Sequence, residues 1–69
     1  MKITTEQIES GEIKLNRLRE ELGISPTEIA RKTGMSRAGV YRALGDNRLP
    51  LNPLIRRVWC NLFGIEKES

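Results

Sequence analysis

The chain has 69 residues, a length that allows one domain with a small core. A single cysteine excludes a disulfide within the chain, and the absence of histidine removes the usual zinc spacings, so we expect no metal site. No signal peptide is apparent, and no apolar run approaches the roughly 18 residues of a membrane span. We therefore expect a cytoplasmic protein with no membrane partner.

The net charge of +3 is unevenly distributed along the chain. Residues 1–30 carry four bases and six acids, for a net charge of −2, whereas residues 31–57 carry seven bases and one acid, for a net charge of +6. A basic block beside an acidic one indicates that part of the surface faces a polyanion. The alternative interpretation is an ordinary solvated face.

The first helix is predicted over about residues 12–22. Four apolar residues recur at helical spacing on or just before it: Ile8, Leu15, Leu18 and Leu22. Gly23 follows in the position of a C-terminal cap. Residues 1–11 form either an extended arm or an extra capped turn, and the sequence leaves both open.

The second helix is predicted to be short. Ser25 occupies the N-cap position, Pro26 suits the first helical position, and Glu28 completes a Ser-x-x-Glu capping box. Ile29 faces inward. Gly34 ends the helix after about two turns, in a tight turn where a positive φ is expected.

A third helix over about residues 36–44 is predicted to begin at the N-cap Ser36 and to end at Gly45. A fourth begins with Asn52 as N-cap and ends at Gly64. Because no stretch alternates with a period of two, the predicted fold class is all-α, with four to five short helices.

The second and third helices, with the Gly-containing turn between them, have the lengths of a helix-turn-helix unit, here about residues 25–45. The segment Pro26 to Gly45 is similar to the helix-turn-helix of Cro-type phage repressors and Xre-like regulators. The matching positions are Ile29, Ala30, Gly34, Met35, Val40, Ala43 and Leu44. The segment also resembles antidote proteins of addiction modules. The resemblance covers about residues 12–65 and implies a single lambda-repressor-like domain over residues 1–69.

This resemblance implies a transcriptional regulator, a repressor, that reads the major groove of double-stranded DNA with the third helix. The candidate DNA contacts are Thr27, Ser36, Arg37, Ala38, Gly39, Tyr41, Arg42, Asn47 and Arg48. Arg37 and Arg42 are the main candidates, because a guanidinium can reach O6 and N7 of guanine together. Tyr41 could donate to a phosphate or touch a thymine methyl. Asn47 and Arg48 are candidates for contacts with phosphates, which position a protein on DNA without selecting a base sequence.

The start of the second helix departs from the usual Xre-like pattern, and a glycine inside the third helix weakens that helix. Many of those domains begin the second helix with a Gln that contacts DNA, whereas Pro26 and Thr27 stand there in this chain. Thr27 and the free N–H groups of the first turn could still bind a phosphate. Gly39 costs the third helix ~1 kcal/mol relative to Ala. Either it is simply tolerated, or it permits a close approach to DNA.

The fourth helix carries an apolar stripe broader than a small core needs. We expect part of it to form a two-fold homodimer contact anchored by Trp59, since Trp is enriched at interface anchors. The candidate interface residues are Ile55, Val58, Trp59, Leu62 and Phe63. The alternative is that all of them belong to the core.

We expect no enzyme, no catalytic residues and no cofactor, because the sequence shows no Gly-rich phosphate loop and no base–nucleophile pair. Two alternatives to a repressor remain. One is an antitoxin that also binds a cognate toxin and regulates its own operon, and the other is a helix-turn-helix reused for protein contact. The short flanking segments leave little room for a toxin-neutralising region, which favours the repressor.

Overall fold

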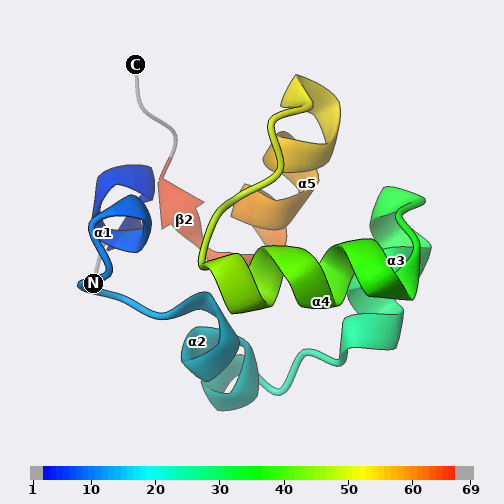
Figure 1. The fold of residues 1–69 in the computed structure, drawn as a ribbon, viewed down its shortest axis with the longest axis horizontal. Helices are drawn as coiled ribbons and strands as arrows, with labels where there is room; N and C mark the ends of the chain where they lie inside the picture. The colour runs from blue at the N-terminus through cyan, green and yellow to red at the C-terminus, as the bar shows by residue number, and fades with distance from the viewer. Residues whose placement is uncertain (1–2, 67–69) are drawn as a thin grey trace.

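The computed structural model describes residues 3–66, which form five short helices and one pair of two-residue strands (Figure 1). In chain order the elements are β1 (Ile3–Thr4), α1 (Thr5–Glu9), α2 (Leu15–Leu22), α3 (Pro26–Thr33), α4 (Arg37–Asp46), α5 (Pro53–Phe63) and β2 (Ile65–Glu66). The prediction of a mostly helical chain is confirmed. None of these helices is both long and apolar enough to cross a bilayer.

The N-terminal segment is a capped helix followed by a turn. Thr4 and Gln7 form a capping box, in which the Thr4 hydroxyl accepts from the Gln7 N–H at 3.3 Å and the Thr4 N–H donates to Oε1 of Gln7 at 3.0 Å. Ile3 pairs with Ile65 in a parallel register, so the two ends of the described chain meet. The all-α prediction missed this pairing, because strands of two residues show no alternation in the sequence.

The first predicted helix begins later than expected. It starts at Leu15 rather than near residue 12, because residues 10–14 form the turn that connects α1 to it. Its end at Gly23 is confirmed, as is the left-handed conformation of Gly34 with φ 76°. The capping box at Ser25 forms only in part. Its side chain accepts from the Glu28 N–H, but the Glu28 carboxylate lies 3.5 Å from Nζ of Lys32.

The predicted end of the third helix at Gly45 is wrong. α4 continues through Gly45 to Asp46, and Asn47 takes the left-handed cap conformation with φ 56°. The Asn47 side chain explains this shift. Its Oδ1 accepts from the Leu15 N–H at 2.6 Å, and its Nδ2 donates to the carbonyls of Ile8 at 2.7 Å and Ile13 at 3.1 Å. These bonds join the end of α4 to the start of α2.

The core forms around α5, and this contradicts the prediction that Trp59 and Phe63 belong to a dimer interface. Trp59 is fully buried and Phe63 is 2% exposed, with their rings stacked at 5.4 Å. In this small domain they are the two largest of the fully buried side chains, and they fill the space between the helices. Other members of the predicted interface are half-buried, namely Ile55, Val58 and Leu62.

Candidate nucleic-acid interface

α3 and α4 are joined by a three-residue turn that is held by several local hydrogen bonds. The Gly34 N–H donates to the carbonyl of Ala30 at 2.8 Å. The Thr33 hydroxyl donates to the carbonyl of Ile29 at 2.7 Å and accepts from the Met35 N–H at 3.2 Å. This turn therefore fixes the direction in which the chain enters α4.

The same turn is also attached to α5. Nε1 of Trp59 donates to the sulfur of Met35 at 3.3 Å, so the buried indole keeps a partner for its N–H. Ala30 and Met35 both pack against the buried cluster. Because α3 contacts both α4 and α5, the position of α4 depends on the core as well as on the turn.

α4 has one buried side and one exposed side. Val40 and Leu44 are buried. The exposed residues at spacing i, i+3, i+4 and i+7, which we call the outer stripe, are Ala38, Tyr41, Arg42 and Gly45. Tyr41 is 59% exposed, which is unusual for a large side chain in a small domain. The outer stripe thus presents an aromatic and a cationic side chain between two small residues.

Arginines on and beside the outer stripe are not neutralised by neighbouring carboxylates. The ion pairs involve other bases: Arg17 with Glu21, Arg19 with Glu20, Lys32 with Glu28 and Arg56 with Glu9. Within residues 3–66, no carboxylate lies within 4.0 Å of a guanidinium nitrogen of Arg37, Arg42 or Arg48. All three arginines are exposed, so their charges are available to an anionic partner.

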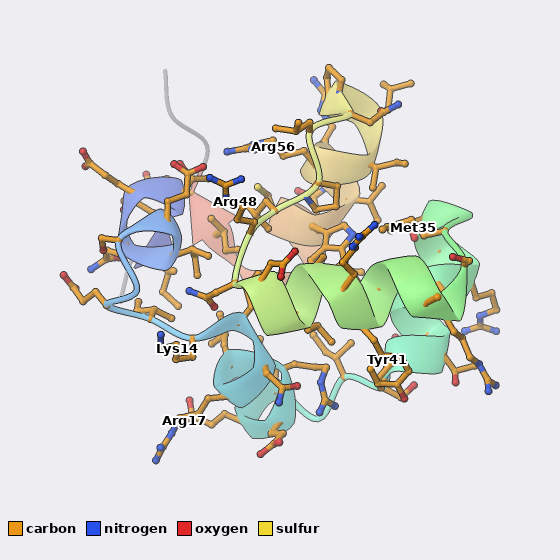
Figure 2. All side chains as sticks on the ribbon, viewed as in Figure 1. Lys14, Arg17, Met35, Tyr41, Arg48 and Arg56 are labelled. Atoms are coloured by element: carbon orange, nitrogen blue, oxygen red, sulfur yellow. The ribbon has the colours of Figure 1, made fainter. Side chains whose placement is uncertain are left out.

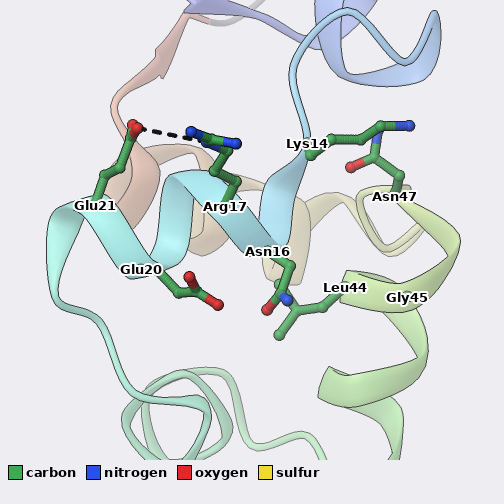
Figure 3. A pocket seen from close by; sticks show the side chains of 8 residues that line it. All are labelled: Lys14, Asn16, Arg17, Glu20, Glu21, Leu44, Gly45 and Asn47. Atoms are coloured by element: carbon green, nitrogen blue, oxygen red, sulfur yellow. Dashed lines mark ion pairs between the residues drawn. The ribbon is translucent and has the colours of Figure 1, made fainter.

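A groove lies on each side of the outer stripe. The first has a volume of ≈ 450 Å³, and its polar lining includes Arg42, Arg48, Glu9 and Asp46. The second has a volume of ≈ 620 Å³ and separates α2 from the end of α4 (Figure 3). Its lining comprises Lys14, Asn16, Arg17, Glu20, Glu21, Leu44, Gly45 and Asn47. The outer stripe is therefore a ridge between two grooves of mixed charge.

The predicted contact residues do not all share one surface. Tyr41 and Arg48 lie on different sides of α4 in Figure 2, although Arg48 shares a groove with Arg42. Thr27 is exposed on the first turn of α3. Ser36 caps α4, where its hydroxyl accepts from the Gly39 N–H at 3.1 Å.

Two of the predicted DNA contacts serve the fold instead. The Asn47 amide makes three hydrogen bonds within the chain, which contradicts its assignment to a phosphate. Gly39 is half-buried, and a Cβ built there lies 3.3 Å from Oγ of Ser36 and 3.5 Å from Cε of Met35. The packing of the turn accounts for this glycine without any DNA.

Of the residues that line the second groove, only Asn47 was among the predicted DNA contacts, and the residues missed include Lys14, Asn16 and Gly45. The i, i+7 spacing of Gly45 from Ala38 is a signal that could have placed it on the outer stripe. Comparison of the chain with family models, with curated proteins and with solved structures finds no match.

Proposed function

We propose that this protein is a sequence-specific transcriptional regulator that binds double-stranded DNA. In this proposal α3, the turn and α4 form a helix-turn-helix of the Cro/Xre type, and the outer stripe of α4 enters the major groove. The observation that carries the proposal is the ridge itself, an exposed helix face with unpaired arginines between two grooves. Repression is the proposed direction, because the sequence resembles phage repressors.

The dimensions of this ridge suit B-form DNA. The major groove is about 12 Å wide and admits an α-helix with its side chains, which is about 10–12 Å across. The two strands that border the groove would then lie along the two sides of α4. Arg48 and Lys14 stand on these opposite sides, where they would contact phosphates. The major groove of A-form RNA is too narrow for such a fit.

The exposed polar side chains of α3 and α4 have distinct roles in this proposal. Arg42 projects from the middle of α4 and reads a guanine through O6 and N7. Tyr41, one residue earlier, contacts a thymine methyl or a phosphate. Arg37 and Thr27 bind phosphates near the first turns of α4 and α3, where free backbone N–H groups also favour anions.

We also propose that the protein binds DNA as a homodimer. Two copies related by a two-fold axis would read half-sites about 34 Å apart on one face of the duplex. With Trp59 and Phe63 in the core, the surface left for this contact is the outward side of α5. Leu54 is 73% exposed there, and Val58 and Leu62 follow at spacing i+4 and i+8.

The proposal is tested by selecting duplexes from a random pool and titrating them by fluorescence anisotropy at physiological salt. We expect Arg42→Ala to cost about 1–3 kcal/mol of binding free energy at one or two base positions, and to leave the melting temperature unchanged. Arg31→Ala is the matched control, because Arg31 is exposed on α3, outside the outer stripe, both grooves and α5, so its loss should not change the preference among base positions. If no selected duplex binds more tightly than random DNA, the proposal is wrong.

A further inference from the structure

α4 contains two glycines between its first and last residues, Gly39 and Gly45. Glycine weakens a helix interior relative to alanine, because it loses more backbone freedom on folding and buries no side chain. A helix of 10 residues that contains two glycines is therefore destabilised at two positions. Only for Gly39 does the structure supply a reason within the chain.

A side chain at position 39 would crowd the turn that precedes α4. The Cβ of any other residue would press on the Ser36 hydroxyl at 3.3 Å, and that hydroxyl caps the helix. It would also meet Cε of Met35 at 3.5 Å. A larger residue at position 39 would therefore disturb the start of α4.

The structure gives no comparable reason for a glycine at position 45. A Cβ built there meets no heavy atom within 4 Å among the residues that the structure describes, apart from its own helix backbone. Its φ is not positive, and the left-handed cap of the helix is Asn47. An alanine at position 45 would fit without strain and would favour the helix. Among the described residues, nothing occupies the space that a side chain at position 45 would fill.

The position of Gly45 indicates from which side a partner would approach α4. It lies on the outer stripe, seven residues after Ala38 and so about 10 Å further along the helix. It also lines the groove between α2 and α4, together with Lys14 and Asn16. The same groove carries the carboxylates of Glu20 and Glu21, which would repel a phosphate placed close to them.

We propose that Gly45 admits the deoxyribose edge of a DNA strand into van der Waals contact with the backbone of α4. This inference rests on the proposed function. The first residues of such a helix reach the base edges, so its last turn lies toward the strand that borders the groove. The sugar edge itself carries no charge, and the phosphates on either side of it would have to lie away from Glu20 and Glu21. Lys14 lies on the same side to bind the next phosphate.

The test uses a size series, Gly45→Ala and Gly45→Leu, in the full chain. Both variants should melt at or above the temperature of the parent, because Ala and Leu are strong helix formers with free space at this position. Both should bind the selected duplex more weakly, by about tenfold for Ala and further for Leu, since the strand must move away. The loss should be similar for every sequence, because a sugar carries no sequence information.

Glu6→Ala is the control. Glu6 is exposed on α1, away from both grooves beside α4 and from the outward side of α5. It should leave the melting temperature and the affinity for DNA nearly unchanged.

Three outcomes would overturn the inference. A Gly45→Ala protein that binds as tightly as the parent shows that nothing approaches this position. A loss confined to one base position shows that Gly45 faces a base edge. A variant that melts below the parent shows that the chain itself needs the glycine. In each case a parent that prefers its selected duplex over random DNA leaves the proposed function intact, and a parent without that preference refutes it.

Discussion

α4 and α5 are helices of similar length with opposite uses of their large side chains. α5 buries its two aromatic residues, Trp59 and Phe63, in the centre of the core. α4 buries only Val40 and Leu44, and its aromatic residue, Tyr41, is 59% exposed. One helix therefore holds the domain together, while the other presents a surface.

The helices also differ in how well their own sequences support them. α5 begins with Pro53, and the Oδ1 of Asn52 accepts from two backbone N–H groups, at 3.0 and 3.2 Å. α4 has one capping bond at Ser36 and two internal glycines. Its stability therefore depends on contacts with the rest of the chain.

Among the variants that test this difference between α4 and α5, Trp59→Ala is expected to change the free energy of unfolding most. Removal of a fully buried indole should lower the free energy of unfolding by about 3–5 kcal/mol, a large share of what so small a domain possesses. Urea denaturation followed by circular dichroism measures it. Trp59→Phe keeps a ring on Phe63 and loses the N–H bond to Met35, so it should cost clearly less. An alanine variant as stable as the parent would contradict the central position of α5.

Asn47 variants test the dependence of α4 on distant contacts. Asn47→Gly keeps the left-handed cap but loses three hydrogen bonds, each worth about 1 kcal/mol, so it should cost about 2–3 kcal/mol. Asn47→Ala should cost about 1 kcal/mol more, because an alanine is strained at φ 56°. Thermal and urea unfolding compare the two variants. If both equal the parent, the end of α4 is not held by its side-chain bonds to residues 8–15.

Leu54→Asp is expected to have the smallest effect on folding. It tests whether the outward side of α5 contacts a second copy of the chain. Leu54 is 73% exposed, so the free energy of unfolding should change by less than about 0.5 kcal/mol. The proposed homodimer should nevertheless weaken, and sedimentation should show a lower stoichiometry on a palindromic duplex. Lys14→Ala removes a proposed phosphate contact that is not on α5, so it should lower the affinity but keep the parent's stoichiometry. A parent that is monomeric both free and on DNA would refute the homodimer.

Helix boundaries set by local chemistry could be predicted from the sequence. The caps at Ser25, Ser36 and Asn52 form as expected, because each needs only a side-chain oxygen and the backbone two or three residues ahead. The outer stripe was predictable for the same reason, since the inward positions Val40 and Leu44 fix which side of α4 faces out. Both features depend only on the spacing of residues within or next to one helix.

The sequence by itself determined four helical segments, with the N-terminal segment left open, and the basic character of residues 31–57. Only the tertiary structure decided that Trp59 lies in the core, that Asn47 binds residues 8–15, and that Gly39 is packed while Gly45 is open. The first set depends on neighbours within one or two helical turns. The second depends on residues up to 39 positions apart, whose meeting is decided by the packing of all five helices together.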